Sequence, residues 1–272
     1  MVPAASRRRL DQLLVERGLV ANRTRARALI LAGRVFRGEE RLDKPGLNVP
    51  GDVEVEVRAG RQHVGRGALK LIGALDSWPM IEVSGRRAID IGSSTGGFSE
   101  VLLDRGAAEV IALDVGRGQL DWSLRQREAV HVMEGVNARY MKPDDLPFTP
   151  ELLVMDVSFI SLEKVWPAVF PCLAEGADAV CLVKPQFEVG RDAVGRGGIV
   201  RDPALHREVL VRLVGFAASR GWRPRACLPS PIRGADGNRE YFLWLQPRGE
   251  EFEVGLEFDG ASLDAALAEI ES

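Results

Sequence analysis

The sequence predicts an α/β fold in which a small α+β domain precedes a larger domain with a doubly wound, mostly parallel sheet. After residue 68, short apolar segments of strand composition alternate with helical segments, which is the pattern of a helix-covered parallel sheet. Two of these segments carry an acidic residue near the carboxyl end, where such sheets bind ligands. The first 60 residues hold twelve Lys and Arg against eight Asp and Glu, although the whole chain has a net charge of −3. A basic N-terminal segment on an otherwise acidic chain indicates that this segment binds a polyanion. The alternative is a charged surface that only contacts solvent.

We expect a small domain at residues 1–58, a linker rich in glycine and arginine at residues 59–67, and the sheet domain at residues 68–272. No apolar run approaches the ~20 residues that span a bilayer, and the N-terminus lacks the apolar segment of a signal peptide. We therefore expect a cytoplasmic protein that does not contact membranes. The three cysteines lie far apart and the three histidines show no metal-ligand spacing, so the sequence predicts neither disulfides nor a metal site. It does not define an oligomeric state.

The N-terminal segment predicts two short helices followed by strands. Leu10, Leu13 and Leu14 recur at helical spacing, and Asn22 is a good N-cap for a second helix that ends before Gly33. Strand composition follows at residues 35–40 and 53–57. Arginines of the second helix and just after it lie near one line along the helix, so they can contact successive RNA phosphates. The candidate RNA-binding residues are Arg9, Arg23, Arg27, Arg34 and Arg66.

This order of elements resembles the small RNA-binding domain named after ribosomal protein S-four. The resemblance rests on Arg9–Leu14, Gly18-Leu19, Arg23–Arg27, Ala32–Val35 and the turn Lys44-Pro45-Gly46, and it covers about residues 6–58. It implies binding of structured RNA without implying a chemistry. An ordinary two-helix cap is the alternative.

The sequence of the larger domain predicts seven strands with helices between most of them. The predicted strands are Arg87–Ile91, Glu109–Asp114, Val130–Met133, Glu151–Asp156, Ala179–Lys184, Arg225–Leu228 and Tyr241–Leu245. The predicted helices include Phe98–Arg105, Leu162–Leu173, Pro203–Arg220 and, at the end of the chain, Ala261–Ile270. Trp166, Trp222 and Trp244 fall at apolar positions and are expected in the core. The glycine- and arginine-rich segment Gln186–Asp202 is either a surface loop or a cover for bound RNA.

The first predicted strand leads into a glycine motif that indicates a nucleotide-containing cofactor. Its spacing, GxxxGG, fits the GxGxxG dinucleotide motif poorly, and Asp90 would repel a pyrophosphate. An acid there suits a ligand with a cationic end, such as S-adenosylmethionine. Asp114, at the end of the next strand, can accept hydrogen bonds from ribose hydroxyls, and Asn137 either borders the adenine or caps a helix. The candidate cofactor-binding residues are Asp90, Gly92, Ser93, Ser94, Thr95, Gly96, Gly97, Phe98, Asp114, Val115 and Asn137. A nucleotide fold with another ligand is the alternative.

Charged residues at strand ends indicate a catalytic group. Asp156 and Lys184 end two apolar strands, and Glu240 opens the last one. Lys70 lies in a helix that leads into the sheet and, taken alone, is expected at the surface. Opposite charges at neighbouring strand ends face one crevice, although a structural ion pair is the alternative.

Together these four residues match the K-D-K-E tetrad of FtsJ-type ribose 2′-O-methyltransferases. Longer motifs resemble the TlyA family: Arg66–Leu71, Ser94–Phe98, Asp114–Leu120, Asp156–Ser161, Lys184–Gly190 and Gly237–Tyr241. This resemblance covers nearly the whole chain. It implies a Rossmann-like methyltransferase sheet of seven strands with the last one antiparallel, S-adenosylmethionine as cofactor, and 2′-O-methylation of cytidine in ribosomal RNA of the large subunit, with the small subunit as a further substrate.

In this interpretation Lys184 is the general base, Asp156 orients it, and Lys70 and Glu240 hold the ribose. If the carboxylates keep Lys184 charged, it instead orients the hydroxyl and stabilises developing negative charge. Two other functions remain open from the sequence. One is a membrane-active haemolysin, a description also given to TlyA relatives, and the other is a non-catalytic rRNA-binding assembly factor.

Overall fold

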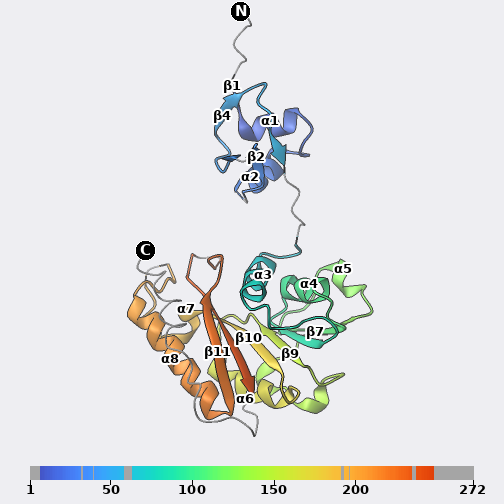
Figure 1. Ribbon diagram of the computed structural model, residues 1–272, viewed down its shortest axis with the longest axis vertical. Helices are drawn as coiled ribbons and strands as arrows, with labels where there is room; N and C mark the ends of the chain where they lie inside the picture. Colours follow the sequence, from blue (N-terminus) through green and yellow to red (C-terminus); the bar gives the residue numbers. More distant parts are fainter. Residues whose placement is uncertain are drawn as a thin grey trace, which may run out of the picture. The chain divides into compact units, whose positions relative to one another are not determined.

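The computed structural model divides the chain into two compact units, Met1–Gln62 and His63–Ser272 (Figure 1). It describes residues 7–31, 33–38, 40–57, 63–190, 193–195, 197–234 and 237–247. The predicted helix Ala261–Ile270 and residues 59–62 of the predicted linker lie outside these residues. His63 and Val64 both contact Glu100, so this end of the predicted linker packs with the second unit.

The first unit contains two helices and two small antiparallel sheets. Its elements are α1 (Leu10–Glu16), α2 (Arg23–Leu31), β1 (Arg7–Arg9) paired with β4 (Asn48–Pro50), and β2 (Val35–Arg37) between β3 (Glu40–Arg41) and β5 (Glu56–Val57). Leucines of α1 and apolar residues of α2 are completely buried in one core together with Val35. Helix α1 was predicted from its leucine spacing and α2 from its Asn22 cap, but β1 and β4 were not predicted, because an Arg-Arg-Arg segment has no strand signature.

The second unit is built on a seven-stranded sheet in the order β11-β12-β10-β9-β6-β7-β8. Its strands are β6 (Arg87–Ile91), β7 (Glu109–Asp114), β8 (Val130–Glu134), β9 (Leu152–Met155), β10 (Asp178–Val183), β11 (Trp222–Pro229) and β12 (Tyr241–Pro247). β12 is antiparallel to both of its neighbours, and the other pairings are parallel. The predicted Rossmann-like sheet with an antiparallel last strand is confirmed. Strand order reverses between β6 and β9, which is where open α/β sheets bind ligands.

Helices cover both faces of this sheet, and alternate strand residues divide between the two layers (Figure 1). Ala88 of β6 packs with α3 (Gly67–Ser77) and α4 (Gly97–Asp104), whereas Ile89 and Ile91 pack with the opposite layer. That layer contains α6 (Trp166–Val169) and α8 (Pro203–Ser219). The remaining short elements are α5 (Trp122–Arg125), α7 (Pro185–Glu188), η1 (Ala138–Tyr140), η2 (Pro143–Asp145), η3 (Leu162–Lys164) and η4 (Phe170–Cys172).

The single helix predicted at Leu162–Leu173 is wrong. The segment forms η3, α6 and η4 in succession. Pro167 and Pro171 each lack a backbone N–H donor and clash with a preceding carbonyl, so one continuous helix cannot form. The three tryptophans predicted in the core are buried there. Among the described residues, none of the helices has the length and apolar character needed to cross a bilayer.

Candidate active site

The loop after β6 passes very close to the end of β9. Gly92 has φ +84° and Gly96 has φ +96°, a region that favours glycine. A Cβ atom at Gly92 would lie 2.4 Å from the carbonyl oxygen of Asp156, and one at Gly96 would lie 2.2 Å from Leu124 Cδ1. Glycine is therefore required at both positions, and the loop and the end of β9 form adjoining walls of one site.

Asp90 does not reach this site as the sequence predicted. Its carboxyl group is completely buried in β6, and Oδ2 accepts hydrogen bonds from the backbone N–H of Ser99 (2.9 Å) and from its hydroxyl (2.7 Å). Burial raises the pKa of Asp90 to about 7. Because Ser99 lies in the first turn of α4, Asp90 ties that turn to the sheet and so positions the glycine loop.

A cavity of about 460 Å³ lies at the carboxyl ends of the central strands, and Asp114 lies on its wall. The cavity is lined by Ile91, Gly92, Ser94, Leu113, Asp114, Val115, Gln119, Val136, Asn137, Ala138, Asp156, Val157, Ser158, Phe159, Ile160 and Val165. Asp114 accepts the N–H of Ser94 on Oδ2 (2.9 Å) and the N–H of Gly116 on Oδ1 (2.7 Å). Each carboxylate oxygen retains a second acceptor position, so Asp114 can still bind a pair of ligand hydroxyls. Asn137 lines the cavity and also accepts the backbone N–H of Arg139 as the cap of η1, so its role as a cap is confirmed and its contact with the adenine stays a prediction.

Glu134, at the end of β8, holds the loop that carries Gln119 to the cavity. Its carboxylate accepts the backbone N–H groups of residues 118–120 and pairs with Arg125. These hydrogen bonds, with that of Gly118 foremost, lower the pKa of Glu134 to about 2. No role could be assigned to Glu134 from the sequence. A glutamate followed by glycine at a strand end is too common a signal to reveal one.

A second hollow of about 180 Å³ adjoins the first and is lined by most of the other predicted cofactor-binding residues. It is lined by Gly65, Arg66, Gly67, Gly92, Ser93, Ser94, Thr95, Gly97, Phe98 and Asp156. Gly92, Ser94 and Asp156 line both spaces. The predicted cofactor-binding residues therefore surround two hollows that meet at Asp156, except for Asp90 and Gly96, which line neither of them.

The four tetrad residues form one ion-pair network at this junction. Lys184 Nζ lies 2.5 Å from Asp156 Oδ1, and Lys70 Nζ lies 2.6 Å from Glu240 Oε2. Lys70 Nζ is also 3.8 Å from Asp156 Oδ2, which connects the two pairs. Lys70 is buried, not at the surface as its sequence context alone indicated, because α3 packs against the sheet. Buried charges of alternating sign offset one another, so both ammonium groups and both carboxylates can be held away from water.

Lys184 and Asp156 present a donor and an acceptor side by side. Lys184 Nζ donates to the hydroxyl of Ser158 at 2.8 Å, and an ammonium has three hydrogens to donate. Asp156 Oδ1 is buried against this ammonium, and Oδ2 is the carboxylate oxygen that can accept a further hydrogen bond. A hydroxyl group both donates and accepts, so this pair is suited to hold one.

Two further features border the tetrad and were not assigned roles from the sequence. Phe159 is 90% exposed, has φ +64°, lines the large cavity, and lies 4.9 Å from the ring of Phe187. On the side of Glu240, a hollow of about 260 Å³ is lined in part by Arg233 and Arg239. The first is an exposed aromatic surface and the second a cationic one, and both suit a nucleic acid strand.

The predicted RNA-binding arginines differ in their surroundings. Arg9 and Arg23 both pair with the buried carboxylate of Asp11, at 3.1 and 3.0 Å, and the hydrogen bond from Arg9 lowers the pKa of Asp11. Arg27 is exposed and Arg34 is half-buried. In the second unit, exposed Arg66 lines the second hollow and donates to the carbonyl oxygen of Arg233 at 3.3 Å. Their role in binding RNA stays a prediction.

Comparisons with known proteins agree with this architecture. The FtsJ-like methyltransferase family matches residues 63–247, and the S4 domain family matches residues 8–55. The chain is 48% identical over 244 residues to the 16S/23S rRNA (cytidine-2′-O)-methyltransferase TlyA of Mycobacterium tuberculosis, which covers 89% of this chain and 91% of the relative. It is 37% identical over 237 residues to hemolysin A of Brachyspira hyodysenteriae, with coverage of 86% and 97%.

Among solved structures, a protein from Streptococcus thermophilus described as a hemolysin is similar to this chain with a TM-score of 0.73 and 38% sequence identity. The similarity covers 98% of this chain and 97% of that chain. The family resemblance inferred from the motifs is thereby confirmed. The chain belongs to the FtsJ-like methyltransferases and, within them, to the TlyA family, with an S4 domain at its N-terminus.

Proposed function

We propose that this chain transfers the methyl group of S-adenosylmethionine to the ribose 2′-hydroxyl of a cytidine in ribosomal RNA. The observation that carries the proposal is the Lys184–Asp156 pair, a donor and an acceptor that lie where the two hollows meet. Large-subunit RNA is the first substrate in this proposal. The name of the Mycobacterium tuberculosis relative supports small-subunit RNA as a second one.

The residues around the large cavity fit S-adenosylmethionine. The volume of about 460 Å³ lies within the usual range for small-molecule sites. Asp114 has free acceptor positions for the two ribose hydroxyls, and Val115, Val136 and Ile160 offer apolar surface to the adenine. When bound, the cofactor supplies an electrophilic methyl group on a sulfonium centre. The chain's own contribution is to hold the cofactor and the hydroxyl in line.

We assign Lys184 an electrostatic role before a proton-accepting one. The ammonium donates to Ser158 and is paired with Asp156, so its next hydrogen bond is available to the hydroxyl oxygen. The Asp156 carboxylate accepts the hydrogen of the same hydroxyl, and Lys70 and Glu240 fix Asp156 from the other side. As the methyl group arrives, the hydroxyl proton passes to this carboxylate and from it to water. The fixed positive charge of Lys184 stabilises the negative charge that develops on the oxygen as its proton is withdrawn.

Delivery of the RNA is assigned to the S4 domain and to the arginines that border the tetrad. Arg27 and Arg34 of the first unit, and Arg66 and Arg233 of the second, carry charges that RNA phosphates attract. Recognition by phosphate contacts should weaken as salt rises. Sequence specificity must come from contacts with bases instead.

The test is transfer of a tritiated methyl group to large and small ribosomal subunits that lack the modification. Lys184→Ala should lower transfer about 10²–10⁴-fold while calorimetry detects unchanged cofactor binding. Lys164→Ala removes an exposed lysine in η3 and serves as the matched control, with transfer unchanged. Lys184→Arg keeps the charge but cannot lose a proton, so it should retain more activity than Lys184→Ala.

Unchanged transfer in Lys184→Ala would remove this residue from the mechanism. Cofactor binding without transfer to either subunit by the wild-type chain would support the non-catalytic assembly factor. Leakage of liposomes caused by the pure protein would support the haemolysin.

A further inference from the structure

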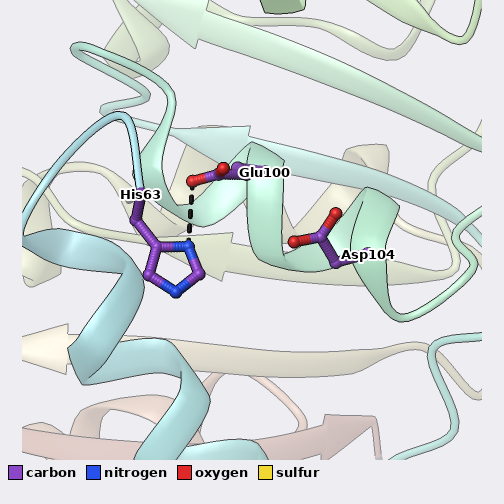
Figure 2. Close-up of side chains that lie close together, drawn as sticks. All are labelled: His63, Glu100 and Asp104. Carbon is purple, nitrogen blue, oxygen red and sulfur yellow. Dashed lines mark hydrogen bonds and ion pairs between the residues drawn. The ribbon is translucent and has the colours of Figure 1, made fainter. Parts of the chain in front are cut away.

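We propose that His63, Glu100 and Asp104 form a binding site for a divalent transition-metal ion such as Zn²⁺. One ligand atom of each residue lies within 4.8 Å of the other two, and the three side chains approach one another at the edge of α4 (Figure 2). Glu100 and Asp104 are four residues apart on α4, so they share one face of the helix. His63 comes from the segment that leads into α3.

The geometry is close to that of a metal site before the ion enters. Bonds of about 2.0–2.2 Å to a central ion place neighbouring ligand atoms about 3.0–3.5 Å apart. His63 Nδ1 and Glu100 Oε2 already lie 3.0 Å apart. Asp104 is exposed, and its ligand atom lies within 4.8 Å of those of His63 and Glu100, so a change of its side-chain rotamer is needed to complete the set.

The donor set selects the class of ion. One imidazole nitrogen and two carboxylate oxygens suit Zn²⁺, Co²⁺ or Ni²⁺, whereas Mg²⁺ and Ca²⁺ prefer oxygen ligands alone. Three protein ligands leave the remaining positions to water. The side chains of His63 and Glu100 are only 14% and 9% exposed, so two ligands are held in place and largely shielded from solvent.

The site has a structural consequence for the neighbouring hollow. Glu100 Oε2 also accepts the backbone N–H of Val64 at 3.0 Å, and Gly65, Arg66 and Gly67 then line the space beside Asp156. A metal ion would therefore fasten this wall to α4. If the proposed function is right, the ion should also tighten cofactor binding. The metal site itself does not rest on that function, because it is tested without cofactor or RNA.

The experiment is calorimetric titration of the untagged full-length chain with ZnCl₂, followed by Co²⁺ titration monitored by visible absorption. We expect one Zn²⁺ per chain, a rise in Tm with added metal, and a ligand-field spectrum with Co²⁺. His63→Ala should abolish the binding, and Asp104→Asn should weaken it at least about tenfold. Asp104 is exposed, so that variant keeps the proposal testable even if His63→Ala fails to fold.

His131→Ala is the matched control. His131 Nε2 lies 2.6 Å from Glu109 Oε2, so it is also a histidine–carboxylate pair, but it is not part of the three-residue cluster. This variant should bind Zn²⁺ like the wild type. Absence of binding at about 100 µM Zn²⁺, or equal binding by wild type, His63→Ala and Asp104→Asn, would overturn the proposal.

Discussion

Asp90 should make the stability of the protein depend on pH. Its carboxyl group is completely buried, Oδ2 accepts both hydrogen bonds from Ser99, and Oδ1 accepts none from the described residues. Loss of hydration on burial raises its pKa from 3.8 to about 7. The folded chain therefore binds the Asp90 proton more tightly than the unfolded chain does.

The sign and size of the effect follow from this difference. The folded state gains from the proton at low pH, and the gain is lost as pH rises through about 7. One pKa unit corresponds to 1.36 kcal/mol, so the full effect is about 4 kcal/mol. About 3 kcal/mol of it falls between pH 5 and pH 8. Asp90→Asn keeps the shape but cannot ionise, so its free energy of unfolding should exceed that of the wild type increasingly as pH rises.

Urea unfolding of both proteins at several values of pH measures this difference. Asp76→Asn serves as the control, because the Asp76 side chain is 63% exposed and its removal should leave the slope with pH unchanged. A constant difference between Asp90→Asn and wild type from pH 5 to pH 8 would refute the reasoning. Asp90 would then be ionised in the folded protein.

Two further predictions concern the walls of the large cavity. Gly92→Ala should lower the free energy of unfolding by about 2–5 kcal/mol, because a Cβ atom would collide with the carbonyl oxygen of Asp156 and the backbone has positive φ. A loss of under about 1 kcal/mol in chemical denaturation would contradict this. Glu134→Gln should weaken cofactor binding, measured by calorimetry, because the substitution loosens the loop at residues 118–120. Protonation of Glu134 should weaken cofactor binding by the wild type in the same way as pH falls from about 4.5 towards 2. Equal affinity in variant and wild type would show that Glu134 does not hold the cavity wall.

The sheet could be predicted from the sequence because its signals are local. Apolar strands and the intervening helices have the right periodicity, and Asp156 and Lys184 could be placed at neighbouring strand ends. The burial of Lys70 could not be predicted, since it depends on how α3 packs against a sheet formed by distant residues. Its residue-by-residue signal is that of an ordinary helical lysine.

The position of Asp90 is the clearest limit of the sequence reasoning. The motif correctly indicated a glycine-rich loop after β6, but a carboxylate beside glycines can face either a ligand site or the first turn of the next helix. The choice is made by Ser99, whose N–H and hydroxyl both reach Asp90. Contacts of this kind depend on three-dimensional placement. The contact between His63 and Glu100 also depends on the folded structure, because the two residues are 37 positions apart in the sequence.

The tetrad assembles because strand register places its members on one face of the sheet. Parallel pairing aligns Cys181 of β10 with Met155 of β9, so continuing this register brings Lys184 level with Ser158, two residues beyond Asp156. Side chains alternate between faces, and a spacing of two therefore puts Lys184, Ser158 and Asp156 on the same side.

Antiparallel pairing of Val183 with Tyr241 brings Glu240 level with Lys184 in the same way. That face is the one covered by α3, which supplies Lys70. A shift of one residue in the pairing of β9 with β10 would turn Asp156 and Lys184 to opposite faces and separate their charges. The apolar residues that hold these strands in register therefore determine the geometry of the tetrad as directly as the four charged residues do.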